Sequence, residues 1–337
     1  MTPPFVRIIL VDYKSGIHLQ RTIDGLAAQT DGDFEAVIVD NACPEGAARM
    51  LDLPDERFRV LTTSENLGFA GGSNFGAAGA KSRFIATLNP DATPAADWLT
   101  NIKKAAERNC ETALFGATLL TNDDPALIDG FGDVLSIYGI PWRGGHGRPV
   151  DDLPDDDREV FSPCGAAAFY RRDVFEALGG FDEDFFCYIE DIDFALRARL
   201  AGERCIQVRQ AICTHVGAVS TEDNPLFRVR MSARNSALMI LKTAPSLYLI
   251  PLFGAYLIVS AYFAMRHAGD HARARLGGLR EALKDAGRAL EKREMVSRVA
   301  ARETAQWLQY APTKLQKQPI VSLPTGSAAT HSNEHGN

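Results

Sequence analysis

The sequence lacks several patterns that define common classes of protein. Its six cysteines include no CxxC pair, which excludes the usual zinc-binding spacing and the disulfide framework of a small secreted domain. It has no GxGxxG stretch and no glycine-rich loop closed by Gly-Lys-Ser/Thr, which excludes the common dinucleotide- and phosphate-binding loops. No signal peptide is expected, because the first apolar run, Phe5 to Val11, is short and strand-like. We therefore expect reduced, mostly buried thiols in a cytosolic protein.

Charge is unevenly distributed along the 337 residues. The net charge is −7, yet residues 266–337 carry 12 Lys and Arg against 7 Asp and Glu, so residues 1–265 hold −12. An acidic body argues against nucleic acid as the main partner. A basic tail behind an apolar stretch indicates a membrane surface instead. The length and the 46% hydrophobic content allow one large domain with an appendage, or two small domains.

Short apolar runs alternate with helical patterns along the first 119 residues. Strands are expected at residues 6–11, 35–40, 58–61, 84–88 and 113–119, and helices at 17–26, 69–80 and 98–108. This alternation predicts an α/β fold, with a Rossmann-like, mostly parallel sheet covered by helices on both faces. Ligands of such sheets bind beyond the carboxyl ends of the strands, which is where Asp12, Asp40 and Asp91 stand.

The most informative segment is residues 182–197, which read DEDFFCYIEDIDFALR. Six carboxylates lie in it, and two of them form the pair Glu190-Asp191. Like charges this close repel, so a cation or a functional proton is expected to compensate them. Asp191 also begins a helical pattern, where the helix dipole favours an anion. A well-capped surface helix is the structural alternative.

Three other features have both a functional and a structural interpretation. Residues 66–74 (NLGFAGGSN) form a glycine-rich turn that can offer backbone N–H groups to phosphate or allow tight packing of a helix on a strand. Asn89-Pro90-Asp91 ends a strand, and Asp91 can hold a divalent cation that bridges substrate phosphates, or cap a helix. His215 follows an extended run and, taken alone, is more often structural than a ligand.

Two later regions depart from the α/β pattern. Residues 122–160 are loop-rich, and a loop this long is usually functional or mobile. Thr243 to Met265 is a run of 23 uncharged residues, long enough to cross a bilayer but interrupted by two prolines and a glycine. It precedes a basic amphipathic helical pattern, so we expect a peripheral or shallowly inserted anchor, with a buried core helix as the alternative. The side chains expected in the membrane interface are Leu276, Leu279, Leu283 and Leu290, and those expected at anionic headgroups are Arg273, Arg280, Lys284 and Arg288.

Several motifs occur together in an order and spacing that resembles a known family. They are Asp40-Asn41-Ala42, residues 66–74, residues 88–91 (LNPD), residues 165–171 (GAAAFYR), residues 179–193 (GGFDEDFFCYIEDID) and Arg234-Asn235. They resemble glycosyltransferase family 2, of the rhamnosyltransferase-like bacterial subgroup. The resemblance implies a GT-A fold, a dTDP- or UDP-sugar donor, Mg²⁺ or Mn²⁺, and inversion at the anomeric carbon.

The resemblance also implies roles for individual residues. Asp40 would contact the pyrimidine base of the donor, and Asn66 and Gly68 would line the nucleotide pocket together with Asp12. Asn89 and Asp91 stand in the place of the family's DxD element, with Asp91 as the metal ligand. Asp191 of the Glu190-Asp191 pair would be the general base, and His215 would be a further ligand to metal or diphosphate. The chain departs from the family pattern at Asn89, which replaces an acidic residue, and at Asp12-Tyr13, where Asn-Tyr or Thr-Tyr is usual.

These observations predict an inverting, metal-dependent glycosyltransferase that moves rhamnose or a related hexose to a surface polysaccharide or a lipid-linked glycan. It would act at the cytoplasmic face of the bacterial inner membrane. Residues 1–242 would form the catalytic domain, residues 243–315 the membrane-association region and residues 316–337 a disordered tail. One alternative is a catalytically silent nucleotide-sugar-binding or scaffold protein, but the intact Asp91 and Asp191 argue against it. Another is a metal-dependent phosphoryl-transfer enzyme, but the missing phosphate-loop lysine argues against that.

Overall fold

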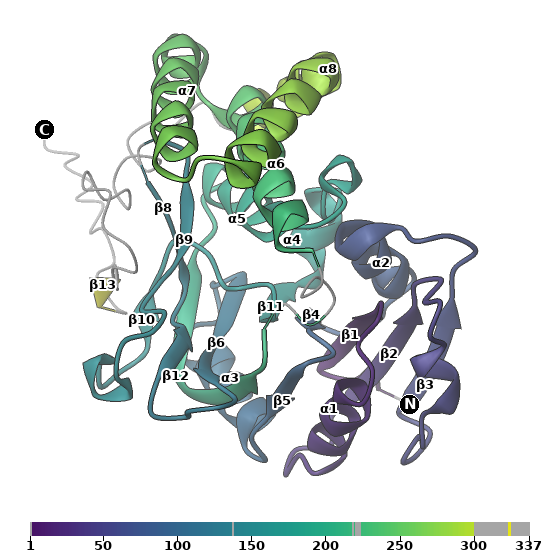
Figure 1. Ribbon diagram of the computed structural model, residues 1–337. Coiled ribbons are helices and arrows are strands. Elements are labelled where there is room, and N and C mark those ends of the chain that lie inside the picture. The colour runs from purple at the N-terminus through teal and green to yellow at the C-terminus, as the bar shows by residue number, and fades with distance from the viewer. Residues whose placement is uncertain (1, 137, 218, 220–223, 300–322, 325–337) are drawn as a thin grey trace, which may run out of the picture.

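A central sheet of eleven strands organises the computed structural model, which describes residues 2–136, 138–217, 219, 224–299 and 323–324. Its main path runs β13-β10-β12-β6-β11-β4-β1-β2-β3, while β5 pairs with β12 and β7 pairs with β6. The strands are β1 (Val6–Asp12), β2 (Phe34–Asp40), β3 (Phe58–Thr62), β4 (Phe84–Leu88), β5 (Ala92–Pro94), β6 (Leu114–Thr121), β7 (Ile128–Gly130), β10 (Arg158–Glu159), β11 (Ala167–Arg171), β12 (Cys205–His215) and β13 (Leu323–Pro324). Figure 1 shows β12, β6, β11, β4, β1, β2 and β3 following one another across the lower half of the molecule.

The sheet is mostly parallel, which confirms the predicted α/β fold. β1 pairs in parallel with β2 and β4, and β2 pairs in parallel with β3. The exception at its centre is β11, which lies antiparallel between β4 and β6. Because β11 comes about 50 residues after β6 in the chain, no local pattern placed it there.

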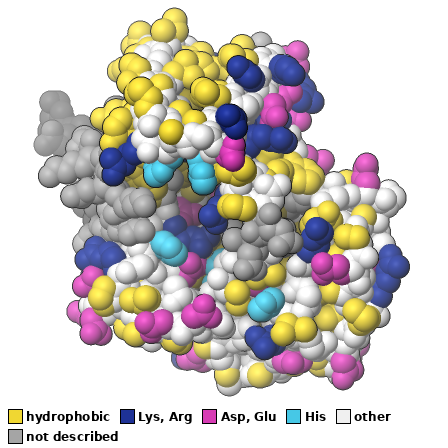
Figure 2. Space-filling view, in the orientation of Figure 1, with side chains coloured by type: hydrophobic (Ala, Val, Ile, Leu, Met, Phe, Trp, Pro, Cys, Tyr) yellow, Lys and Arg dark blue, Asp and Glu magenta, His cyan; other side chains and the backbone are white. Residues whose placement is uncertain are grey.

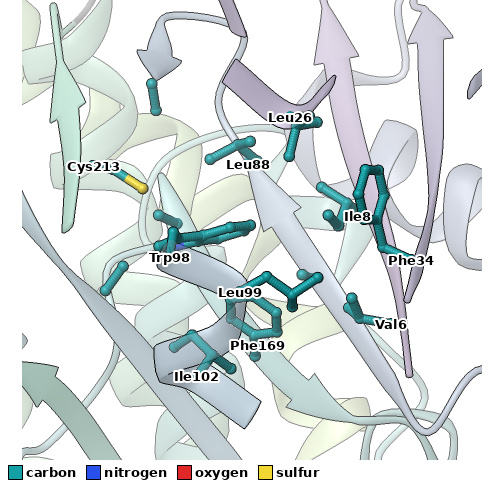
Figure 3. Close-up of a cluster of buried hydrophobic side chains, with 14 of the residues drawn as sticks. Val6, Ile8, Leu26, Phe34, Leu88, Trp98, Leu99, Ile102, Phe169 and Cys213 are labelled. Atoms are coloured by element: carbon teal, nitrogen blue, oxygen red, sulfur yellow. The ribbon is translucent and has the colours of Figure 1, made fainter. Parts of the chain in front are cut away.

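Helices cover both faces of the sheet, as alternation along the buried strands requires. In β1, Ile8 and Leu10 join one core cluster and Ile9 and Val11 join the other. The helices are α1 (His18–Ala27) and α3 (Trp98–Arg108) on the first face, and α2 (Gly68–Ala77), α4 (Arg172–Ala177) and α5 (Glu190–Leu200) on the second. Figure 3 shows the first cluster, where Trp98 of α3 packs on Phe169 of β11 with 4.9 Å between ring centroids.

Three helices at the C-terminal end stand together at one end of the sheet (Figure 1). They are α6 (Pro225–Thr243), α7 (Leu249–Arg266) and α8 (Asp270–Val299). The long apolar run is broken at Pro245, and a 3-10 turn, η5 (Ser246–Tyr248), precedes α7. α6 and α8 share a core cluster with α5, in which Ala237, Ala282 and Ala289 are buried.

The region 122–160 contains more regular structure than predicted. Besides β7 and β10 it holds the hairpin β8 (Asp133–Leu135) with β9 (Pro141–Arg143) and a 3-10 turn, η2 (Val150–Asp152). Two more 3-10 turns, η1 (Ala47–Met50) and η3 (Glu183–Phe185), follow β2 and precede α5. The predicted disordered tail, residues 316–337, lies outside the described residues except for β13.

Candidate active site

The LNPD turn and His215 meet at one edge of the sheet. β5 pairs antiparallel with β12 so that Ala92 lies opposite His215. Asp91 is 7% exposed; its Oδ1 lies 3.4 Å from His215 Nε2, and Gly217 N donates to its Oδ2 at 3.0 Å. Asn89 Nδ2 lies 3.3 Å from the same imidazole nitrogen. A strand, not a helix, follows Asp91, so the helix-cap interpretation of this residue is wrong.

A second carboxylate, Asp129 on β7, holds the other side of His215. Asp129 Oδ2 lies 2.7 Å from His215 Nδ1 and 2.7 Å from Arg143 Nη1 on β9, and its Oδ1 lies 3.2 Å from His146 Nδ1. Burial opposes ionisation of Asp129, but hydrogen bonds from the two histidines and the charge of Arg143 outweigh it and lower its pKa far below the usual range. Sequence reasoning missed Asp129 and Arg143, and the only signal was the length of the segment that contains them.

The residues around His215 fit a divalent cation. Because a carboxylate only accepts hydrogen bonds, the Asp129 contact places the Nδ1 proton of His215 and directs Nε2 towards Asp91 and Asn89. Metal-binding histidines commonly have such a carboxylate behind them. Burial opposes ionisation of Asp91, yet the hydrogen bond and charge of His215 lower its pKa, so it is an anion at neutral pH. Asp91 and His215, with Asn89 beside them, would hold Mg²⁺ or Mn²⁺ together with oxygens of a substrate.

The acidic pair lies at the start of α5, partly buried rather than on an open surface helix. Asp191 is partly exposed, and Gly165 N donates to its Oδ2 at 2.9 Å while Ile192 N donates to its Oδ1 at 2.8 Å. Glu190 is 5% exposed, and within the described chain its Oε2 has no hydrogen-bond partner. Burial and the neighbouring Asp191 raise the pKa of Glu190 well above its ordinary value. Burial thus favours the protonated form of Glu190, and Asp191 is the member of the pair that is partly exposed to a substrate.

Two buried groups, Asp133 of β8 and Cys164, accompany Asp191. Ligand atoms of the three residues lie within 4.8 Å of one another. Burial and the nearby Asp191 raise the pKa of Asp133 to about 8, and burial raises the pKa of the Cys164 thiol well above its usual range. Metal ligands of these types must lose their protons, so this cluster suits a cation poorly. At neutral pH it places a protonated carboxyl group beside Asp191.

Asp133→Asn is expected to stabilise the protein increasingly as the pH rises from about 4 to about 8. The folded-state pKa of Asp133 is raised from 3.8 to about 8, so its stabilising contribution is complete below pH 4 and is lost as the pH rises to 8. Asparagine does not titrate, so the difference between variant and wild type should reach a few kcal/mol, on the order of 1.4 kcal/mol per pH unit.

Urea unfolding at several pH values measures this difference. Asp156→Asn is the matched control, since its side chain is 81% exposed, and its unfolding curve should follow that of the wild type at every pH. A constant difference between Asp133→Asn and the wild type across pH 4 to 8 would contradict a buried, protonated Asp133.

Three further acidic residues of the segment, Asp182, Asp184 and Asp193, are paired with cations, as the crowding of charge predicted, while Glu183 accepts a hydrogen bond from Asn74 Nδ2 at 3.0 Å. Lys242 of α6 lies 2.7 Å from both Asp182 and Asp193, and Lys292 of α8 lies 2.8 Å from Asp184. The segment is thus divided in two. Cations compensate Asp182, Asp184 and Asp193, and a proton compensates Glu190.

The loop between η3 and α5, residues 186–189, has an unusual backbone. Phe186, Tyr188 and Ile189 have φ angles of 62°, 67° and 74°, in the left-handed region that costs energy for side chains of this size. Asn235 of α6 holds the loop, because its Nδ2 donates to the carbonyl oxygens of Phe185 at 2.8 Å, Cys187 at 2.9 Å and Tyr188 at 2.7 Å. The Arg234-Asn235 motif therefore has a structural role: Asn235 supports the loop that leads into Glu190.

The glycine-rich turn packs against the same loop and against the sheet. A side chain at Gly68, where φ is +71°, would collide with the carbonyl group of Phe186. Side chains at Gly72 and Gly76 would collide with Val11 and Ile9 of β1. The absence of side chains at these glycines therefore allows α2 to pack closely on β1 and on the Phe186 loop.

Asn66 is close to Gly68 and lies beyond the end of β3. Its Oδ1 accepts hydrogen bonds from Gly68 N at 2.9 Å and from Asn41 Nδ2 at 3.0 Å. These bonds fix the turn that leads into α2.

Asp12 and Asp40 lie side by side at the ends of β1 and β2, as predicted from their positions after the strands. Both are buried and hold the loops that follow. Asp12 accepts hydrogen bonds from the Ser15 hydroxyl and from Ala48 N, and burial raises its pKa. Asp40 accepts from Cys43 N at 3.0 Å and lies 3.3 Å from Arg49 Nε.

The fold and the acidic site define a glycosyltransferase of the GT-A type. The fold is similar to that of a mannosyltransferase from Pyrobaculum calidifontis solved with GDP-Man and Mn²⁺, with a TM-score of 0.52 and 17% identity over 90% of this chain and 88% of that one. It is also similar to TarS 1–349 of S. aureus solved with UDP-GlcNAc, with a TM-score of 0.55 and 15% identity over 88% of this chain and 83% of that one.

The chain belongs to glycosyl transferase family 2, whose model matches residues 8–179, and a model of glycosyl transferase family group 2 matches residues 157–266. It is 27% identical to an N-acetylglucosaminyl-diphospho-decaprenol L-rhamnosyltransferase of Mycobacterium tuberculosis over 241 residues, 65% of this chain and 78% of that protein. It is 29% identical to the O-antigen biosynthesis protein RfbC of Myxococcus xanthus over 223 residues, 61% of this chain and 17% of that protein. These relatives confirm the resemblance to the rhamnosyltransferase-like subgroup.

Proposed function

We propose that this glycosyltransferase is inverting and metal-dependent, and that it moves rhamnose or a related hexose from a nucleotide-sugar donor to a lipid-linked glycan or surface polysaccharide. One observation supports this most strongly. Asn89 N donates to Ala166 O at 2.8 Å, and Gly165 N donates to Asp191 Oδ2 at 2.9 Å. Two consecutive residues thus join the proposed metal turn to the proposed base. Inverting transfer needs this adjacency, because the base must take the acceptor proton while the diphosphate leaves on the other side of the sugar.

In this mechanism Asp191 accepts the proton of the acceptor hydroxyl on a carboxylate oxygen. Its backbone donors, Gly165 N and Ile192 N, hold the carboxylate in place. Asp91 and His215 would hold the cation, which supplies charge neutralisation for the leaving diphosphate. Arg143 adds a fixed positive charge near Asp191 as well as near Asp129.

The proposed donor pocket lies at the carboxyl ends of β1 to β4. Asp12, Asp40, Asn66 and Gly68 would contact the nucleotide there, with Asn89 near the diphosphate. Rhamnose is proposed because the mycobacterial relative carries that activity in its name. The pyrimidine nucleotide, dTDP or UDP, is proposed from the family resemblance of the Asp40 motif.

A donor-hydrolysis screen tests the activity directly. The purified full chain is incubated with individual nucleotide sugars, with Mn²⁺ or with a chelator, and nucleotide release is measured. Release from one dTDP- or UDP-sugar in Mn²⁺ alone is the expected result. The proposal fails if no donor is hydrolysed, and its metal part fails if the chelator has no effect.

Asp91→Ala is expected to weaken metal-dependent donor binding, and His215→Ala to weaken it less. A carboxylate supplies charge as well as an oxygen ligand to Mg²⁺ or Mn²⁺, whereas an imidazole supplies only a neutral nitrogen. Calorimetric titration of the donor in Mn²⁺ and in chelator measures both effects. Asp97→Ala is the control, because Asp97 is exposed and makes no side-chain cap on α3. Equal donor affinity of the wild type in metal and in chelator would rule out this role.

We also propose that the enzyme works at the cytoplasmic face of the inner membrane, held there by residues 243–315 beside a catalytic unit of residues 1–242. Ser246–Arg266 is apolar enough to cross a membrane, and only 22% of it is buried. Ile250, Ile258 and Met265 are 85%, 72% and 75% exposed, so α7 is not the buried core helix of the alternative interpretation. Figure 2 shows hydrophobic side chains gathered over α7 at the top of the molecule.

Only some of the α8 side chains that were expected to meet the membrane are exposed. Leu276, Leu283 and Leu290 are exposed, but Leu279 packs against the core. Arg288 pairs with Asp285 of the same helix at 2.5 Å. The exposed leucines support the interfacial proposal, and Leu279 belongs to the protein core instead.

The combined substitution Ile250→Ser, Ile258→Ser and Met265→Ser is expected to move the protein from the membrane fraction to the soluble fraction at low salt. Interfacial binding scales with buried apolar area, and these changes remove that area without touching the core. The matched control is Ile17→Ser with Met50→Ser and Phe75→Ser, three exposed apolar residues elsewhere. A wild-type chain that is wholly soluble without detergent would contradict the anchor.

A further inference from the structure

A groove of about 390 Å³ lies between α6, α7 and the β8–β9 hairpin, outside the site described so far. Its walls are mostly apolar. The side chains that matter here are Trp142 of β9, Ile189, Val229 of α6, Tyr256 and Phe263 of α7, and Arg275 of α8. The volume lies at the lower end of the range of small-molecule sites, which are also concave and mainly apolar.

The polar side chains of the groove include one arginine and two histidines beside Ser232 and Ser236, and the described lining holds no carboxylate. Arg275 makes no ion pair within the described part of the chain; its guanidinium stacks 5.3 Å from the ring centroid of Phe263. Burial in the groove lowers the pKa of Arg275. His267 and His271 line the same groove with ring centroids 6.5 Å apart. A half-buried cation without a carboxylate partner favours an anionic ligand, and the best partners of arginine are planar or branched oxyanions such as phosphates.

The groove is next to the proposed base. Ile189, which lines it, directly precedes Glu190-Asp191. Trp142 lines it too, and the adjacent Arg143 contacts Asp129 in the catalytic site. Successive side chains of a strand point to opposite sides, so β9 is the wall between groove and active site.

The groove also lies beside the exposed apolar surface. Tyr256 and Phe263 of α7 face it, while Ile258 and Met265 of the same helix are exposed. Figure 2 shows histidine and basic side chains directly below the hydrophobic cluster at the top of this face, where the face is hollowed. A ligand with an anionic head and a long apolar chain would place its head in the groove and its chain along the exposed apolar side of α7.

We propose that this groove binds the polyprenyl diphosphate portion of a lipid-linked acceptor, an assignment that rests on the proposed glycosyltransferase function. The diphosphate contacts Arg275, His267 and His271, and the first isoprene units contact Trp142, Tyr256 and Phe263. The sugar carried by the diphosphate then extends past Ile189 to Asp191. The groove thereby selects a diphosphate-linked lipid over a free sugar or a soluble glycan.

Binding of geranyl diphosphate to the purified full chain tests the proposal. Tryptophan fluorescence is the readout, because Trp142 lines the groove whereas Trp98 is fully buried in the core. We expect saturable quenching that is lost in Trp142→Phe, and a Kd about tenfold higher in Arg275→Ala, the usual loss for one charge-assisted contact. Arg273→Ala is the matched control on the same helix, where the side chain is 82% exposed, and it should bind like the wild type.

Two further ligands identify what is recognised. Inorganic diphosphate and geraniol should each bind at least tenfold more weakly than geranyl diphosphate. Equal binding of diphosphate alone would reduce the groove to an anion site, and equal binding of geraniol would reduce it to an apolar site; either result overturns the proposal. So does unchanged affinity in Arg275→Ala.

Donor hydrolysis without acceptor separates this inference from the proposed function. Arg275→Ala should hydrolyse donor at the wild-type rate, since Arg275 lies in α8 and lines the groove, whereas the proposed donor pocket is built from the ends of β1 to β4. A chain that hydrolyses donor but does not bind geranyl diphosphate refutes the groove assignment alone. A chain that hydrolyses no donor refutes the glycosyl-transfer proposal beneath it.

Discussion

Asp191→Asn is expected to reduce sugar transfer by ~10²–10⁴-fold, the typical cost of losing a general base. The amide keeps the shape of the side chain and can still accept a hydrogen bond from Gly165 N, but it cannot take the acceptor proton. Donor affinity should be nearly unchanged, because Asp191 acts on the acceptor. The measurement is a comparison of transfer rate with calorimetric donor binding.

Asp156→Asn provides the matched control for this variant. It makes the same chemical change at a carboxylate that is 81% exposed, and its transfer rate should equal that of the wild type. Normal turnover in Asp191→Asn would assign the base to another residue. A parallel loss of donor binding would instead indicate that Asp191 shapes the donor pocket.

Lys242→Met is expected to lower the free energy of unfolding by about 3–5 kcal/mol, the cost of leaving buried charge unpaired. Lys242 lies 2.7 Å from both Asp182 and Asp193, and the three side chains are only 3%, 8% and 0% exposed. Methionine fills a similar volume but leaves these carboxylates with fewer cations. Urea denaturation measures the change.

Arg273→Ala is the control for an ion pair that matters little. Its partner is Asp270, and the two side chains are 82% and 68% exposed, so solvent screens the pair and the expected loss is below about 1 kcal/mol. If Lys242→Met costs no more than this control, the buried cations do not hold the acidic segment together.

The parallel half of the sheet could be predicted because each of its strands is a continuous apolar run. Asp91, Asp191 and His215 could be selected because they stand at strand or helix ends within recognisable blocks. The structure brings Asp91 and His215 into contact and links Asn89 to Asp191 through residues 165–166.

Asp129, Asp133 and Arg143 could not be predicted, for a physical reason. They belong to strands of three residues each, which are too short to show a period of two. β7 pairs with the preceding β6 at two positions, and β8 pairs with β9 at three, so each pairing is too short to leave a pattern in the sequence. Similarly, the sequence offered Asn235 as part of a motif, but only the left-handed backbone at Phe186 to Ile189 explains why an amide is needed there.

The support of this loop by α6 has a consequence for how the chain can be divided. Asn235 holds the loop, and its neighbour Arg234 is fixed by Asp285 of α8 at 2.6 Å. The C-terminal helices are therefore not an interchangeable module that can be cut away or replaced by the tail of another enzyme. A chimera joined at residue 243 would keep every proposed catalytic side chain and Asn235, yet lose Asp285, the α8 partner that fixes Arg234 beside Asn235. Engineering of acceptor range in this enzyme has to preserve the contact between α6 and α8.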